Sequence, residues 1–478
     1  MAINQFRSLN FKRKIRLKLT VSIVSFPQNV NKTIFSTNFD PDMLVSFTVE
    51  NFLSFGSSNT VSFLATPLKS GKENTFMPPS LEWDYRLLRS VGILGFNAAG
   101  KTNLLRAIAA MKYAVLYSGS SSGNLFLSTV SPFLLKKDNE KITQFEVLFF
   151  LNNKKYRYGY KVASGIVHEE WLFYAEPKIR ENNLFVRNKR SLTFNKNWNK
   201  DADNSLETLF KRVQDHTLFL SVLGVLNVQP AVDILKWFER IVVVESFDAE
   251  RFIDFAIEKL NDDIFRHVFK RILNEAEVGF NTVTEQKIAA AEKSGTVGGD
   301  FVDFMLHNEI LPKNKYNVQT VHTVFNAEGQ EVGTIHFDLR KQESAGTKKF
   351  FGLIGLFLEA MTNRRILLFD ELDGQFHFAL YETLVRFFND QKVNPKGAQL
   401  LFTSHNTTLL KGNKIRRDQL YSIEKSIYGE SVLRRFHEKG NTLRTDASIE
   451  KEYQERTLKG KSGEDLTLFS GLIDFPDA

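Results

Sequence analysis

The sequence predicts an α/β protein in which buried parallel strands carry polar residues at their ends, beside a β-rich N-terminal lobe. Three observations support this prediction. A short apolar run at 90–94 leads into a glycine-rich loop and then a helical pattern. Two further apolar runs, at 366–369 and 398–403, end in acidic or polar residues. Between 43 and 175, several segments alternate apolar and polar residues, as half-buried strands do.

The first elements along the chain are expected to be strands. Residues 43–66 have the pattern of a β-hairpin, with VSFTVENF followed by NTVSFLA. Residues 131–175 contain three strand-like runs separated by Asn-Asn-Lys and Ala-Ser-Gly, both typical turn sequences. Together these runs predict a β-rich N-terminal lobe, whose strands both precede and follow the glycine-rich loop in the sequence.

The middle of the chain is expected to be helical. Residues 204–276 repeat apolar side chains at helical spacing, and 285–300 have the composition of a mobile loop. A second hairpin is predicted over 316–339, turning at 326–329 (NAEG). These features predict an inserted helical lid region that ends in a hairpin.

Five segments follow from this reading. Residues 1–42 form a basic extension without a core pattern, and 43–175 form the N-terminal lobe with the glycine-rich loop. Residues 176–340 hold the helical insertion and hairpin, 341–453 form the C-terminal lobe, and 454–478 form a tail. The extension is interpreted as poorly packed sequence upstream of the folded domain rather than as a targeting peptide, because its apolar stretch LTVSIVSF is too short for a secretory core.

Composition excludes several classes of protein. No apolar run approaches the roughly 20 residues of a membrane-spanning helix, and the chain has no cysteine, which fits a cytoplasmic location. The net charge is +8, but residues 1–42 alone carry seven basic and two acidic residues. The rest of the chain carries 56 basic and 53 acidic residues, so composition does not promise a nucleic-acid-binding face.

The glycine-rich loop GFNAAGKT matches the phosphate-binding pattern G-x-x-x-x-G-K-[ST]. Gly95 and Gly100 allow the tight turn, and the backbone N–H groups together with the positive end of the next helix face the phosphates. Lys101 is placed to reach the β- and γ-phosphates, and the Thr102 hydroxyl to hold Mg²⁺. The expected ligand is therefore a nucleoside triphosphate.

Two later strands supply acidic and imidazole groups. The run ILLF ends in Asp370 and Glu371, at the edge of the sheet where ligands of open α/β sheets bind. Asp370 is expected to coordinate Mg²⁺, and Glu371 to orient and deprotonate the attacking water. The run AQLLFTS ends at His405, which is expected to contact the γ-phosphate.

A second anion site is predicted at ESAGTKKFFGLIGLF. Ser344 is a plausible N-cap of this helix, and Gly346 lies in its first turn. Since the phosphate loop already serves the nucleotide within the chain, the economical interpretation is that Ser344 and Gly346 bind the γ-phosphate held by a neighbouring molecule. The alternative is an ordinary capped helix after a turn.

The order of these motifs resembles the ATP-binding-cassette (ABC) type heads of SMC, RecF and OLD proteins. Asn97 and Asn103 also match that group. More narrowly, MLVSFTVENFLSF, TQFEVLFF, YRYGY, EEWL, LLFDELD, LLFTSHNTTLL, IRRDQLYSIEK and RTDASIEKEY resemble the abortive-infection ATPases of bacterial defence operons, over residues 43 to about 453. The signature ESAGT lacks the paired glycines of transporters, and no glutamine loop is assigned, because Gln144 lies on a strand-like run.

This resemblance implies a P-loop ATPase that uses ATP and Mg²⁺ and forms a homo-oligomer, either a dimer with ATP sandwiched between subunits or a larger ring. It also implies a sensor or regulator of phage defence that controls a separately encoded nuclease or toxin.

Other classes compete with this interpretation. A DNA-repair ATPase of the SMC or RecF type shares the site chemistry. The sequence has no long heptad insertion, and its near-neutral composition does not indicate a basic face for DNA. A transporter subunit lacks an identifiable coupling surface. A self-contained nuclease of the OLD type needs a second acidic metal site, and the residues after His405 show no strand that delivers clustered acids. A non-hydrolysing structural protein would not need Lys101 and Glu371.

Overall fold

The computed structural model describes residues 42–437 with short gaps. The gaps fall at 69–70, 78–82, 84, 120–123, 137–140, 196–197, 199–204, 246, 276–279, 281, 291–313, 375–377 and 407–414. The predicted extension, apart from Asp42, and the predicted tail lie outside the described residues. Within the described residues, no helix combines the length and the apolar character needed to cross a membrane.

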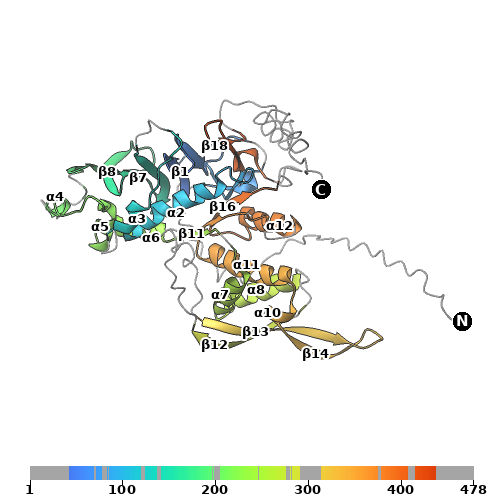
Figure 1. Ribbon diagram of the computed structural model, residues 1–478. Helices are drawn as coiled ribbons and strands as arrows, with labels where there is room; N and C mark the ends of the chain where they lie inside the picture. Colours follow the sequence, from blue (N-terminus) through green and yellow to red (C-terminus); the bar gives the residue numbers. More distant parts are fainter. Residues whose placement is uncertain are drawn as a thin grey trace, which may run out of the picture.

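A seven-stranded antiparallel sheet forms the N-terminal part of the fold, in the order β10-β9-β8-β7-β6-β1-β2 (Figure 1). Its strands are β1 (Leu44–Glu50), β2 (Asn59–Ser62), β6 (Thr143–Leu151), β7 (Lys154–Ala163), β8 (Ile166–Ala175), β9 (Asn182–Asn188) and β10 (Ser191–Phe194). The predicted hairpin β1–β2 and the three strands β6, β7 and β8 are therefore confirmed. Their predicted turns are tight ones, because Asn152, Asn153, Ser164 and Gly165 all have positive φ.

A six-stranded sheet carries the predicted phosphate loop, in the order β11-β15-β16-β5-β17-β18. Its strands are β5 (Ser90–Leu94), β11 (Ile241–Val244), β15 (Ile366–Phe369), β16 (Gln399–Ser404), β17 (Leu420–Lys425) and β18 (Ser431–Arg435). All pairings are parallel except β17–β18, so the carboxyl ends of β5, β15 and β16 meet at one edge. This places the loop, the acidic pair and the histidine side by side, as the sequence predicts.

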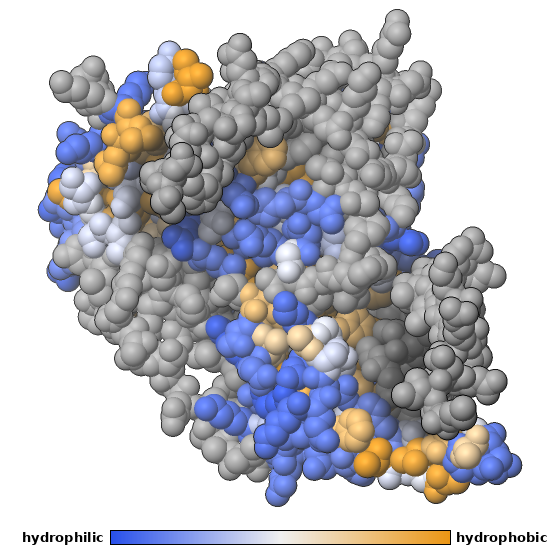
Figure 2. Space-filling view, turned by 45° about the vertical axis from the view of Figure 1, so that its right-hand side comes forward, coloured by the Kyte–Doolittle hydropathy of each residue, from blue (hydrophilic) through white to orange (hydrophobic). Residues whose placement is uncertain are grey.

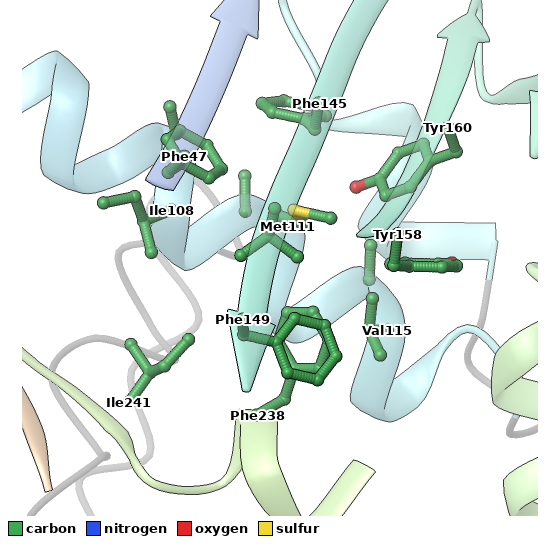
Figure 3. Close-up of a cluster of buried hydrophobic side chains, with 14 of the residues drawn as sticks. Phe47, Ile108, Met111, Val115, Phe145, Phe149, Tyr158, Tyr160, Phe238 and Ile241 are labelled. Atoms are coloured by element: carbon green, nitrogen blue, oxygen red, sulfur yellow. The ribbon is translucent and has the colours of Figure 1, made fainter. Parts of the chain in front are cut away.

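Helix α2 (Lys101–Tyr117) lies between the two sheets. This position buries most of its side chains and explains its long apolar run. Figure 3 shows Ile108, Met111 and Val115 of α2 packed against Phe145 and Phe149 of the antiparallel sheet. Burying side chains of this size contributes about 1.5–3 kcal/mol each. The N-terminus of α2 is therefore held rigidly beside the loop that precedes it.

The opposite face of the six-stranded sheet is covered by α11 (Ala345–Thr362) and α12 (Phe378–Asn389) (Figure 1). Side chains of β15 alternate between the two faces: Ile366 and Leu368 join the core with α2, whereas Leu367 and Phe369 join the core with α11. This strand is buried on both sides, which explains its continuous apolar sequence.

Helix α11 packs closely against α7 (Ala249–Lys259) at two glycines. A Cβ at Gly355 would clash with Ala256, and one at Gly352 would approach the Phe252 Cβ at 2.8 Å. Helices α8 (Asp263–Glu275) and α10 (Leu339–Gln342) and the sheet β12-β13-β14 complete this region. The sheet comprises β12 (Thr282–Ala290), β13 (Asn314–Phe325) and β14 (Glu331–Asp338), so the predicted hairpin with its turn at 326–329 is confirmed.

The remaining elements are short. They are η1 (Lys72–Asn74), β3 (Thr75–Phe76), β4 (Leu87–Leu88), α3 (Asn124–Ser128), α4 (Ser205–Phe210), α5 (Phe219–Val225), α6 (Ala231–Phe238) and η3 (Arg417–Gln419).

The middle of the chain differs from the sequence prediction in three elements. Strands β9 and β10 extend the antiparallel sheet beyond residue 175, and β11 is a strand of the P-loop sheet within the segment predicted to be helical. β11 is only four residues long, too short for its period to be separated from the helices around it. Residues 285–290 of the predicted mobile loop belong to β12, and 291–300 lie outside the described residues. The domain boundaries themselves stay predictions.

Candidate nucleotide-binding site

The loop between β5 and α2 has the geometry of a phosphate cradle. Gly100 has a φ of 107° and Ala98 a φ of 62°, so the backbone turns sharply just before α2 begins. The N–H groups of the first helical turn have no partners inside the helix and point toward the loop's concave side. The Lys101 Nζ donates to the carbonyl oxygens of Gly95 (2.9 Å) and Phe96 (3.0 Å), so the lysine folds back over the loop.

Two serines that lie far from this loop in the sequence stabilise it through hydrogen bonds. Ser431 Oγ, at the start of β18, donates to the Ala99 carbonyl (2.6 Å) and lies within hydrogen-bond distance of Ser54 Oγ (2.8 Å). Asn103 Nδ2 donates to the same Ser54 Oγ at 2.8 Å. A Cβ at Gly100 would clash with both serine hydroxyls, and one at Gly95 would lie 2.7 Å from the Ile423 carbonyl oxygen. The packing around the loop therefore requires glycine at both positions.

The acidic pair lies directly beside the loop. Thr102 Oγ1 donates to Asp370 Oδ2 at 2.6 Å, and Thr403 Oγ1 donates to Asp370 Oδ1. Thr403 Oγ1 also accepts from the Glu371 N–H at 2.8 Å. Glu371 has a φ of 49°, a left-handed conformation that turns the chain away from the sheet and leaves its side chain 53% exposed. Asp370 is thus fixed and buried, whereas the Glu371 carboxylate faces outward.

His405 links the two halves of the site. Its Nδ1 lies 3.3 Å from the Lys101 Nζ, and its Nε2 lies 3.3 Å from Glu371 Oε1. The His405 N–H donates to Asp373 Oδ2 at 3.0 Å, which fixes the backbone at the end of β16. The imidazole therefore lies between the lysine of the loop and the exposed carboxylate.

Burial shifts the pKa values of the acidic and basic groups of the site in opposite directions. Desolvation raises the pKa of Asp370, while its bonds from Thr102 and Thr403 oppose that shift. Desolvation also lowers the pKa of Lys101, and the nearby carboxylates, led by Asp370, oppose it. Both shifts disfavour charge, so a ligand that brings both a cation and anionic phosphates would compensate both groups.

The signature turn, which we define as residues 343–347 (ESAGT) at the start of α11, lies apart from the group around Lys101. Ser344 caps this helix as predicted: its Oγ accepts from the Thr347 N–H at 3.1 Å. Ser344, Ala345 and Gly346 are exposed. A Cβ at Gly346 would find only Ser344 Oγ, 3.7 Å away. Among the described residues, the side-chain hydrogen bonds of Ser344 stay within its own helix turn.

The structure thus brings together most of the predicted site. Lys101, Thr102, Asp370, Glu371 and His405 form one continuous group of contacts. Asn97 is exposed on the loop, Asn103 supports the loop through Ser54, and Gln144 lies within β6, whereas Ser344 and Gly346 belong to a separate surface.

Sequence reasoning missed the polar residues that support the site: Ser54, Asp373, Thr403 and Ser431. For Thr403 a signal existed, because a threonine at the buried end of LLFTSH has to find a hydrogen-bond partner. Ser54 and Ser431 are far from the loop in sequence and follow no motif.

A parallel sheet, a glycine loop at a helix N-terminus and an acidic pair on a neighbouring strand define a P-loop nucleotide-binding domain. The chain belongs to the family described as "AAA domain, putative AbiEii toxin, Type IV TA system", whose model matches residues 90–411. That match includes every residue of the site described above except Ser54 and Ser431. A search of curated proteins finds no match.

Solved structures include distant likenesses. The SMC head domain from Thermotoga maritima is 14% identical with a TM-score of 0.36, covering 82% of this chain and 98% of its own. The Pyrococcus furiosus Smc head with an extended coiled coil, bound to the C-terminal domain of ScpA, is 11% identical with a TM-score of 0.40, covering 87% and 99%. The recombination mediator RecF with ATP is 13% identical with a TM-score of 0.33, covering 84% and 99%.

Proposed function

We propose that this chain is a Mg²⁺-dependent ATPase in which Lys101, Asp370, Glu371 and His405 form the site of ATP hydrolysis. The convergence of these four side chains at one sheet edge is the observation that carries the proposal. The loop N–H groups and Lys101 bind the phosphates, and Glu371, exposed at that edge, orients and deprotonates the attacking water. His405, within 3.3 Å of both Lys101 and Glu371, contacts the γ-phosphate and holds the carboxylate in place.

The Thr102–Asp370 pair fits a magnesium ion. Hard oxygen donors suit Mg²⁺, and the buried Asp370 carboxylate has a raised pKa that a cation would lower again. When bound there, the ion neutralises charge between the phosphates. Thr403 holds the second carboxylate oxygen, so Asp370 presents a fixed orientation to the ion.

We further propose that two copies of the chain share each ATP. Glycine at 346 is unexplained by the packing of a single chain, because a Cβ there would meet only Ser344 Oγ, at an ordinary contact distance of 3.7 Å. Close approach of an outside phosphate would explain it. Ser344 and the exposed first turn of α11 would then bind the γ-phosphate held by the loop of a neighbour. The resulting assembly is an ATP-sandwich dimer or a larger ring.

The biological role that we propose is regulation of a separately encoded nuclease or toxin in bacterial defence against phage, within the cytoplasm. The family description, which names a toxin of a toxin–antitoxin system, supports a place in such systems. Because ADP lacks the γ-phosphate, hydrolysis would change the contacts between copies and therefore the state of a bound effector.

Plating efficiency of phage tests this role. Cells carrying the chain together with its neighbouring reading frames should restrict phage, and the same cells with Lys101→Ala should not. The chain expressed alone should give no protection, because the effector is encoded elsewhere. Full protection by the isolated chain would contradict a separate effector. If Lys101→Ala instead sensitises cells to DNA damage without changing phage plating, the repair function replaces this one.

A further inference from the structure

The β13–β14 hairpin presents an unusual amount of apolar surface. Four large apolar side chains near its turn are exposed: Val332 (61%), Phe325 (57%), Ile335 (46%) and Val324 (37%). Figure 2 shows apolar residues gathered with polar ones at the lower right, the end of the molecule formed by this hairpin. Such a patch on a protruding element is typical of a surface that binds another protein.

The outer strand of this hairpin is also an open sheet edge. In the order β12-β13-β14, the strand β14 pairs with β13 alone among the described strands, and its first six residues are exposed. Its sequence EVGTIHFD contains neither lysine nor proline, the residues that usually protect an edge from pairing. The edge is therefore able to accept an added strand through backbone hydrogen bonds.

Charge indicates which strand would pair there. Residues 326–337 contain two acidic residues, Glu328 and Glu331, and no lysine or arginine. A second copy of β14 pairing antiparallel about Thr334 and Ile335 would bring Glu331 opposite Asp338, and a parallel copy would align Glu331 with itself. Like charges directly opposite destabilise a strand pair. Self-pairing is therefore disfavoured, and a basic partner strand is favoured.

We propose that β14 is the docking edge for a partner protein, which adds an extended strand with alternating apolar side chains and flanking lysines or arginines. The apolar side chains of that strand cover Val324 and Ile335, which share one face of the hairpin, and its cations face Glu328 and Glu331. Identifying this partner as the effector rests on the proposed function, but the docking edge does not.

The hairpin is joined to the signature turn by a short chain of contacts. Ile335 pairs with His322 across the hairpin, and the His322 Nε2 lies 2.7 Å from Glu343 Oε1. Thr320 Oγ1 donates to the same Glu343 oxygen at 2.5 Å. Glu343 immediately precedes Ser344. A strand docked on β14 would therefore be connected, through His322 and Glu343, to the turn proposed to bind a neighbour's γ-phosphate.

A random peptide library displayed on phage and selected on the full chain tests the docking edge. We expect enriched peptides to alternate apolar residues and to carry flanking lysines or arginines. These peptides should bind the Val332→Lys/Ile335→Lys double variant about tenfold or more weakly, because an edge cation repels them. Ile427→Lys is the matched control: Ile427 is 91% exposed on the β17–β18 turn, and its substitution should leave binding unchanged. Thermal unfolding of both variants checks that they fold.

Several results would overturn the proposal. Enrichment of no peptide, of acidic peptides, or of peptides that bind the double variant equally well would exclude this edge as the docking site. Nucleotide-free dimers that dissociate in the double variant would make a second copy the occupant. Peptide binding only after truncation to Met43 would make residues 1–42 the occupant. Because binding is measured without ATP, these failures are distinct from a failure of ATP hydrolysis.

Discussion

The phosphate loop and the signature turn both place a glycine near a helix N-terminus, but for different reasons. At Gly100 a φ of 107° and two serine hydroxyls leave no room for a Cβ, so the fold of the single chain requires glycine. At Gly346 the φ is not left-handed, and the nearest atom to a Cβ would be 3.7 Å away, so the fold tolerates a side chain there. The fold of the single chain therefore explains the glycine of the loop, whereas it leaves the glycine of the signature turn to the proposed contact with a second copy.

The same difference appears in the polar contacts. The loop region is cross-linked by Ser54, Thr403, Ser431 and His405, from three separate parts of the chain. Ser344 contacts only its own helix turn among its side-chain hydrogen bonds, and it is exposed. Substitutions in the first region should therefore alter binding or chemistry within each chain, whereas substitutions in the second should act only between chains.

The largest effect is expected for Glu371→Gln, which changes the chemistry while preserving the loop. The amide cannot deprotonate water, so ATP turnover should fall by about a hundredfold to ten-thousandfold. ATP affinity, measured by fluorescence titration with a labelled analogue, should stay within about threefold of the wild type, because Glu371 is not part of the cradle. Turnover near the wild-type rate would remove Glu371 from the role of base.

Lys101→Ala should weaken ATP binding by about a hundredfold, because the phosphates lose a partly buried cation. Calorimetric titration measures the affinity. Ser344→Ala is the matched comparison, and it should leave monomer affinity unchanged. Equal ATP affinity of wild type and Lys101→Ala would show that the nucleotide binds elsewhere.

Thr403→Val tests the support beneath the acidic pair. The variant leaves the Asp370 carboxylate and the Glu371 N–H without the hydroxyl, which should cost about 1–3 kcal/mol of unfolding free energy and lower turnover about tenfold. Thr403→Ser keeps the hydroxyl and should restore most of the turnover. Denaturant unfolding and steady-state hydrolysis measure the two effects, and loss of turnover in the serine variant alone would contradict this role.

Prediction from sequence was most successful where local rules determine the structure. The strand ILLF, the loop glycines, the Ser344 cap and the Asn326–Gly329 turn each follow from a short pattern and are confirmed. β11 was missed because IVVV sits between helices, and only its pairing with β15 makes it a strand. Ser54 and Ser431 were missed because tertiary packing alone brings them to the loop. Short sequence patterns therefore predict the local structure of the site, whereas they do not predict contacts between residues that are distant in the sequence.

The smallest effect is expected for Gly346→Ala on the fold. Its unfolding free energy should stay within about 0.5 kcal/mol of wild type, since a Cβ there meets no close atom. Gly100→Ala should lose about 1–3 kcal/mol or more, because the left-handed φ and the serine hydroxyls oppose a side chain. Denaturant unfolding of the pair measures the contrast, and equal losses would mean that both glycines serve the single chain.

The central claim is that each ATP is completed by two copies of the chain. Mixing Ser344→Arg protein with Lys101→Ala protein tests it most directly, because each is expected to be inactive alone for a different reason. In a mixed dimer, one site combines an intact Lys101 with an intact Ser344 from the other chain. Under proven subunit exchange, we predict that ATP hydrolysis returns, up to about half the wild-type rate per dimer. If no activity returns, the nucleotide is hydrolysed within a single chain and the shared-site account is wrong.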